Sequence, residues 1–102
     1  PNTNLGHNSI TFMLERQVEY TLKALQALDE KGAAALVPTE AAQAAYNADL
    51  QEKLGKTVWA DPACNSWYKT GTGKITQNWS GHTRAYADAV AEVKLEDYEL
   101  VP

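Results

Sequence analysis

The clearest hydrophobic pattern in the chain lies between residues 10 and 31, where apolar side chains recur at spacings of three and four. The positions that share one helical face are Leu14, Val18, Leu22, Leu25 and Leu28. Asn8 or Ser9 is suited to cap the start of this helix, and Gly32 is suited to end it in a left-handed conformation. The pattern therefore predicts a helix roughly 33 Å long, at about 1.5 Å per residue.

The first turn of this helix also carries Ile10, Phe12 and Met13, which point to different sides. A helix end that is apolar all round is usually buried between two partners. Few other elements in the sequence can supply those partners. We therefore expect these three side chains to form an exposed patch in the isolated chain, through which it self-associates.

A short apolar segment and a second helix follow the glycine. Residues 33–37 are compatible with a strand, and Pro38 suits the first position of a helix that ends at Leu54, before Gly55. The inner side of this second helix is thin and rich in alanine. Its predicted members are Ala42, Ala45, Tyr46, Asp49, Leu50 and Leu54.

The second half of the chain begins with a loop over residues 56–74 that concentrates the aromatic side chains Trp59, Trp67 and Tyr68. β-Branched and aromatic residues predict a strand over residues 75–79. Ser80 then suits the cap of a third helix over residues 81–93, followed by a short tail. The predicted inner face of that helix contains Tyr86, Ala89, Val90 and Val93. The expected fold class is helix-rich α+β, with three helices and one or two short strands.

Composition narrows the function classes without naming one. The chain has 102 residues, so it forms at most one domain, and nine Lys and Arg against thirteen Asp and Glu give a net charge of -4. An acidic balance argues against nucleic acid as a partner. A single cysteine, Cys64, forms neither an internal disulfide nor a multi-cysteine zinc site. No apolar run is long enough to span a membrane and no signal segment is visible, so the expected location is the cytoplasm.

Familiar catalytic and metal motifs do not fit. Residues 69–74, K-T-G-T-G-K, suggest a phosphate-binding loop, but Tyr68 and Ile75 occupy the positions where the Walker pattern needs glycine and Ser or Thr. A glycine turn between two extended segments is the better interpretation. His7 and His82 are the only histidines and lack a metal-ligand spacing. We therefore predict no metal site and no catalytic residue in this chain.

The first nine residues, P-N-T-N-L-G-H-N-S, place a glycine and several small polar side chains ahead of the long helix. Free backbone N–H groups and the positive end of the helix dipole gather at such a position. It accommodates a phosphate, a carboxylate or an electron-rich heteroatom. Simple helix capping is the alternative interpretation.

These nine residues resemble the G-P-N-T-x-x-G-H-N-S segment of flavin-dependent monooxygenases of the Baeyer–Villiger and flavin-containing monooxygenase group. Three further segments are similar, in the same order, to the C-terminal end of that family. They are C-N-S-W-Y at 64–68, N-W-S-G at 78–81 and D-Y-E-L at 97–100. The family's leading glycine would precede Pro1. We therefore expect the chain to be a piece of a longer protein.

The resemblance implies a C-terminal piece of a Rossmann-like FAD-binding α/β domain. Residues 1–32 would form a flavin-facing loop and the last long helix of that domain, and residues 33–102 a C-terminal extension with an aromatic loop. Thr3, Asn4, Leu5 and Gly6 would lie beside the isoalloxazine ring of FAD. Trp67 would correspond to a tryptophan that contacts NADP in several family members; a plain packing role is its alternative.

The function implied by the resemblance is the insertion of one oxygen atom from O2 into a small ketone or heteroatom substrate, with FAD and NADPH as cofactors. The family's glycine-rich fingerprints and catalytic arginine map before Pro1. The isolated 102 residues should therefore be inactive, and their main partner would be the remainder of the parent chain. The alternative is a small helical interaction domain without catalytic activity.

Overall fold

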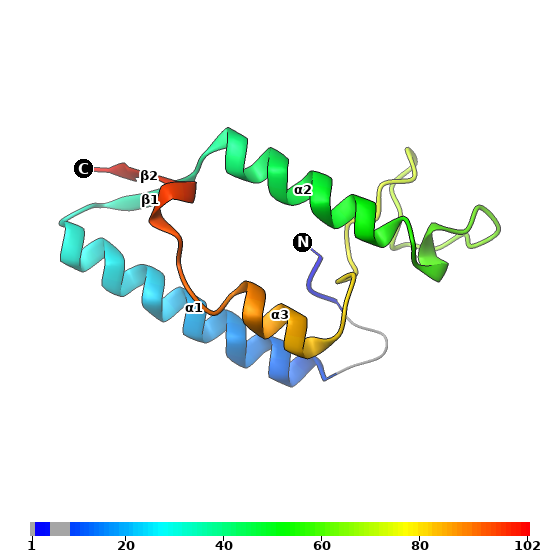
Figure 1. Ribbon diagram of the computed structural model, residues 1–102, viewed down its shortest axis with the longest axis horizontal. Coiled ribbons are helices and arrows are strands. Elements are labelled where there is room, and N and C mark those ends of the chain that lie inside the picture. Colours follow the sequence, from blue (N-terminus) through cyan, green and yellow to red (C-terminus); the bar gives the residue numbers. More distant parts are fainter. Residues whose placement is uncertain (1, 5–8) are drawn as a thin grey trace.

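The structure, a computed structural model, describes residues 2–4 and 9–102. Its elements in chain order are α1 (Ile10–Lys31), β1 (Ala35–Pro38), α2 (Glu40–Leu54), η1 (Val58–Ala60), α3 (Thr83–Ala89), η2 (Leu95–Asp97) and β2 (Tyr98–Val101), where η marks a short 3-10 helix. Figure 1 shows α1 and α2 as two long arms that meet the small β1–β2 sheet at one end, with α3 beside α1. The helix-rich α+β class is confirmed for the described residues.

Helix α1 has the bounds that its sequence pattern predicts. The Ser9 hydroxyl accepts a hydrogen bond from the Phe12 N–H at 3.3 Å, which caps the first turn. Gly32 adopts φ 62, and its N–H donates to the carbonyl of Asp29. Because only glycine takes this left-handed conformation without a Cβ penalty, the helix ends here.

The apolar face of α1 is not buried. Leu14, Val18, Leu22 and Leu25 are each more than half exposed, at 53%, 58%, 55% and 56%. Met13 is the one buried residue of this helix. The sequence pattern therefore predicts the helix correctly, but the surface against which its stripe packs does not come from the described residues.

Strands β1 and β2 pair antiparallel, with Ala35 opposite Val101 and Pro38 opposite Tyr98. The predicted strand over 33–37 is therefore confirmed with a small shift, and its partner comes from the segment that we expected to be a short tail. Pro38 ends this strand and does not start α2. The Thr39 hydroxyl instead accepts from the Ala42 N–H at 3.2 Å and caps that helix.

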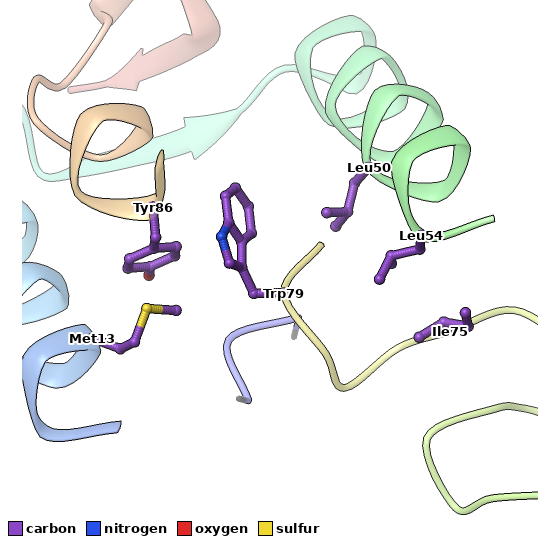
Figure 2. Packing of buried hydrophobic residues seen from close by; sticks show 6 residues of the cluster. All are labelled: Met13, Leu50, Leu54, Ile75, Trp79 and Tyr86. Carbon is purple, nitrogen blue, oxygen red and sulfur yellow. The ribbon is translucent and has the colours of Figure 1, made fainter. Parts of the chain in front are cut away.

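The hydrophobic core joins α1, α2 and α3 to the segment that contains Ile75 and Trp79 (Figure 2). Its buried members are Met13, Leu50, Leu54, Ile75, Trp79 and Tyr86. The rings of Trp79 and Tyr86 meet edge to face, with centroids 5.2 Å apart. Leu50 and Leu54 confirm part of the predicted inner side of α2, whereas Tyr46 is 51% exposed.

The predicted exposed patch in the first turn of α1 is only partly correct. Met13 is fully buried in the core, because α3 lies against α1 and covers it with Tyr86 (Figure 2). Ile10 remains 51% exposed. Phe12 is half-buried, and the guanidinium of Arg16 lies 5.2 Å from the centroid of its ring.

Two other predictions need correction. Residues 75–79 form isolated bridges and no named strand, because side chains of Asn2 and Gln51 occupy backbone groups that a strand ladder would use. The third helix spans only Thr83–Ala89, and His82 caps it in place of Ser80. It ends before the predicted Val93 because Val90 leaves the α-helical conformation, at φ -108 and ψ 16.

The chain is extended for its length. Its radius of gyration is 15.4 Å and its dimensions are 50 × 28 × 18 Å. A compact domain of about 100 residues has a radius of gyration of about 13 Å. The helices in the described part of the chain are also too short or too polar to cross a membrane.

Candidate cofactor-facing site

The N-terminal residues lie alongside the segment 75–79, more than seventy positions away in the sequence. The Asn2 N–H donates to the Thr76 carbonyl at 3.0 Å, and the Asn4 N–H donates to the Gln77 carbonyl at 2.9 Å. The Trp79 N–H donates to the Asn4 carbonyl at 3.0 Å, which completes a parallel bridge. These bonds fix Thr3 and Asn4, two of the predicted flavin-facing residues, against the core.

Asn2 makes the most specific contacts of this junction. Its side-chain amide donates to the carbonyls of Ile75 and Asn78, at 2.9 and 3.0 Å. The residue is 5% exposed and adopts φ 59, a left-handed conformation that asparagine tolerates better than most residues. Both N–H groups of the amide and the backbone N–H therefore end on three carbonyls of one short segment.

Gln51 of α2 holds the same segment from the other side. Its Nε2 donates to the Ile75 carbonyl at 2.8 Å, and its Oε1 accepts from the Ile75 N–H at 3.3 Å. Ile75 is 3% exposed, so these groups have little access to water. The Ile75 carbonyl thus accepts from both Asn2 and Gln51, and the segment is fixed between the N-terminal residues and α2.

The predicted flavin-facing residues are placed in part. Thr3 and Asn4 are partly exposed, whereas Leu5 and Gly6 lie outside the described residues. Asn4 Nδ2 donates to Asn78 Oδ1 at 3.5 Å. Asn78 is fully buried, and among residues 2–4 and 9–102 its Nδ2 has no partner. Polar groups are therefore concentrated next to the loop that the resemblance assigns to FAD.

The start of α1 keeps the electrostatic character expected from the sequence. Ser9 caps the Phe12 N–H, and the first turn carries no acidic side chain. The positive end of the helix dipole is therefore not neutralised by a carboxylate of its own. This end fits an electron-rich group of a bound cofactor.

Trp67 lies on the loop between η1 and segment 75–79. It is 70% exposed, which excludes a core packing role within the described residues, and its ring packs on Tyr68 with centroids 4.6 Å apart. Lys69 stabilises the loop because its ammonium donates to the carbonyls of Asp61 and Cys64, at 2.8 and 2.9 Å. The loop therefore presents one indole face on a fixed base.

The glycine-rich segment after this loop is a turn, as predicted. The Gly73 N–H donates to the Thr70 carbonyl and the Thr70 N–H to the Lys74 carbonyl, both at 2.9 Å, and Gly73 has φ 83. Lys69 and Ile75 pair antiparallel across the turn. This arrangement is a tight turn between two extended pieces, not a phosphate cradle opening a helix.

A cavity of about 800 Å³ lies between α2 and the α1–α3 side of the molecule. Its lining includes Tyr20, Tyr46, Trp79, Tyr86 and Tyr98. Burial raises the pKa of Tyr20, Tyr46 and Tyr86 above the usual value for tyrosine. Within residues 2–4 and 9–102, no group of three His, Cys, Asp or Glu side chains is placed to hold a metal ion.

Sequence reasoning missed the residues that organise this site. Asn2, Gln51 and Asn78 carry the side-chain bonds around segment 75–79. Asn2 and Asn78 lie within motifs that carry the family resemblance, but those motifs do not predict the contacts, and Gln51 belongs to no motif. Their partners lie from 24 to 76 positions away, and no periodic signal reports such contacts. The asparagine at position 2 is the one residue whose type, typical of left-handed turns, gives a local clue.

Similar proteins cover almost the whole chain. The FAD-binding monooxygenase ktnD of Aspergillus niger is 40% identical over 98% of this chain and 17% of its own length. Two proteins named Baeyer–Villiger monooxygenase, from Streptomyces coelicolor and Pseudomonas aeruginosa, are each 35% identical. They match 99% and 98% of this chain, and 20% and 19% of their own lengths. No protein-family model and no solved structure matches the chain.

These relatives are named FAD-binding monooxygenase or Baeyer–Villiger monooxygenase. The chain is homologous to one segment of the FAD-binding and Baeyer–Villiger monooxygenases. It spans about a fifth of the length of these relatives.

Proposed function

We propose that this chain is the C-terminal part of an FAD- and NADPH-dependent monooxygenase that inserts one oxygen atom from O2 into a ketone or heteroatom substrate. The observation that carries the proposal is the homology, at 40% and 35% identity over nearly all of the chain, to proteins named as FAD-binding and Baeyer–Villiger monooxygenases. In this proposal FAD, when bound, supplies the oxygen chemistry, and the chain supplies binding and orientation.

The described residues fit a flavin on one side. Thr3 and Asn4 are partly exposed on a backbone held by bonds to Thr76, Gln77 and Trp79. The first turn of α1 offers a positive dipole end without a competing carboxylate. Thr3, Asn4, Leu5 and Gly6 are therefore proposed to line the isoalloxazine, with α1 directed at its electron-rich pyrimidine side.

Trp67 is proposed to contact NADPH. Its indole is 70% exposed on a loop held by Lys69, and it offers one stacking face and one N–H donor. Both are suited to a ribose or an adenine ring. The exposure supports this role because a tryptophan that served to pack the fold would have its ring buried against other side chains.

The remainder of the parent chain is the proposed cover for α1. Four aliphatic side chains of its stripe are more than half exposed, and an exposed stripe of this kind marks an interface. The relatives are about five times longer than this chain, so in them further residues are available to cover the corresponding helix. In the isolated 102 residues the stripe and Ile10 are expected to drive self-association instead. Light scattering that shows a monomer at high concentration would contradict this expectation.

The deciding experiment uses the full-length protein, purified with its flavin and supplied with NADPH, a cyclic ketone or thioether, and isotopically labelled O2. We expect a flavin absorption spectrum, NADPH oxidation that depends on substrate, and one labelled oxygen atom in the product. Oxidation of NADPH that gives only hydrogen peroxide contradicts oxygen insertion. A full-length product near 100 residues without flavin supports the alternative, a helical interaction domain.

A further inference from the structure

Asn2 lies between the two loops that the proposed function assigns to different cofactors, and the inference below rests on that proposal. It directly precedes Thr3 and Asn4 on the flavin side. Its three N–H donors end on Ile75, Thr76 and Asn78, at distances of 2.9 to 3.0 Å. No other described residue joins the N-terminal segment to 75–79 with a side chain that is bonded twice.

The conformation of Asn2 indicates a specific requirement at this position. A residue other than glycine at φ 59 is uncommon, and it persists when surrounding contacts hold it there. The two carbonyl bonds of the side chain supply that restraint, in a site with 5% exposure. The direction in which the chain leaves Asn2, toward Thr3, is therefore set by segment 75–78.

The same segment is bonded to the Trp67 loop on its opposite edge. The Thr76 N–H donates to the Tyr68 carbonyl at 3.0 Å, and Lys69 pairs with Ile75. The ring of Tyr68 in turn supports the ring of Trp67, with centroids 4.6 Å apart. Only two residues, Thr76 and Tyr68, separate Asn2 from the proposed NADPH contact.

Segment 75–78 has little freedom to absorb a displacement from either side. Gln51 brackets Ile75 with bonds of 2.8 and 3.3 Å, and Asn78 is fully buried. A packed, hydrogen-bonded segment of this kind transmits a shift because it cannot deform gradually. We infer that Asn2 is a positioning residue that couples the flavin-facing loop to Trp67. Its loss weakens NADPH binding although Asn2 lies beside the flavin-facing residues and does not itself contact NADPH.

The test uses the full-length flavoprotein with Asn2→Gly, which tolerates the left-handed backbone and removes the side chain with its two N–H donors. Because Asn2 is proposed to act on NADPH only through Trp67, the KM for NADPH should rise, and by no more than the roughly ten- to hundredfold expected for Trp67→Ala. The KM for NADPH should change more than the kcat at saturating NADPH and more than the FAD content. Trp67→Ala should cost less NADPH affinity in the Asn2→Gly background than alone, because coupled residues are not additive.

Asn47→Ala is the matched control. Asn47 Nδ2 also donates to a backbone carbonyl, that of Gln43 at 2.9 Å, but within α2 and away from segment 75–78. This variant should leave the KM unchanged. An Asn2→Gly variant with an unchanged KM, or with effects strictly additive to those of Trp67→Ala, overturns the inference.

A measurement on the wild type covers the case in which the variant does not fold. Adding NADP+ to the full-length flavoprotein should slow hydrogen exchange at the amides of Asn2 and Asn4, and leave the exposed middle of α2 unchanged. Unchanged exchange at both amides overturns the inference. A wild-type protein that lacks FAD or does not use NADPH overturns the proposed function, and the assignment of Asn2 with it.

Discussion

The hydroxyl oxygens of Tyr20 and Tyr98 lie 2.6 Å apart and join the middle of α1 to the first residue of β2. The pair lines the cavity between the two long helices. Burial of Tyr20, followed by its hydrogen bond with Tyr98, raises the pKa of the Tyr20 hydroxyl. The neutral form is therefore the one that the fold stabilises.

The first prediction concerns the pH dependence of stability. A group whose pKa is raised in the folded state stabilises the fold below its unfolded pKa, about 10 for tyrosine, and loses that contribution as pH rises beyond it. We expect the melting temperature to fall above about pH 10. Tyr20→Phe should cost about 1 kcal/mol at neutral pH and flatten the alkaline decline. Thermal melts between about pH 8 and about pH 11 check this, and a decline identical to that of the wild type would contradict it.

The second prediction concerns the core residue that the sequence placed on an exposed patch. Met13 is fully buried (Figure 2), so Met13→Ala should lower the free energy of unfolding by about 2–5 kcal/mol. Val58→Ala, at a position 74% exposed, should change it by less than about 0.5 kcal/mol. Denaturant unfolding of both variants provides the comparison. Equal effects would show that Met13 is not a core residue.

The elements that the sequence predicted best are those with local signals. The Ser9 side chain caps the start of α1, and the left-handed φ of Gly32 ends it, so both ends of that helix follow from local chemistry. The surface that covers the apolar stripe of α1 is made by residues distant in sequence. The pattern therefore gives no information about whether that surface lies within the same 102 residues.

The elements that were predicted poorly depend on distant partners. Strand β2 forms because β1 is opposite to it, sixty or more positions earlier in the sequence. Its four residues, Tyr98–Val101, are too few to give a strand pattern by themselves. Residues 75–79 have strand propensity, yet Asn2 and Gln51 take their backbone groups. The flavin-facing loop was recognised by a resemblance whose motif includes Asn2, whereas the bonds by which Asn2 holds segment 75–78 could be seen only in the fold.

The third prediction separates backbone strain from steric fit. Gly32 has φ 62 and open space where a Cβ would lie, so Gly32→Ala should cost about 1 kcal/mol through conformation alone. Gly71 also has open space but no positive φ, and Gly71→Ala should be close to neutral. Thermal melts of the pair measure the difference. A neutral Gly32→Ala would show that the helix end adapts without the left-handed residue.

The fourth prediction concerns Gln51 of α2, whose side chain bonds the backbone of Ile75. Gln51→Leu removes the partner of the Ile75 N–H, which is buried, and should destabilise the fold by about 1–3 kcal/mol. Gln43→Leu, at an exposed position of the same helix, should be nearly neutral. Hydrogen exchange at the Ile75 amide adds a local measurement. Unchanged protection there would mean that another group replaces Gln51.

The last prediction addresses Trp67, whose ring is 70% exposed and supported by Tyr68. In the full-length protein, Trp67→Ala should raise the KM for NADPH about ten- to a hundredfold, because a hydrogen bond and a stacking surface worth roughly 1–3 kcal/mol are lost. FAD occupancy should stay nearly unchanged, since the proposed flavin contacts belong to Thr3 and its neighbours. The melting temperature should also change little.

A packing tryptophan predicts the opposite result. Truncation of a core indole typically costs about 3–5 kcal/mol of stability. The measurement therefore pairs NADPH kinetics with a thermal melt, and Trp67→Phe serves as the control because it keeps an aromatic face and loses the N–H donor. If stacking dominates, the phenylalanine variant retains most of the affinity. If the melting temperature falls sharply while the KM stays constant, Trp67 supports the fold and does not contact the cofactor.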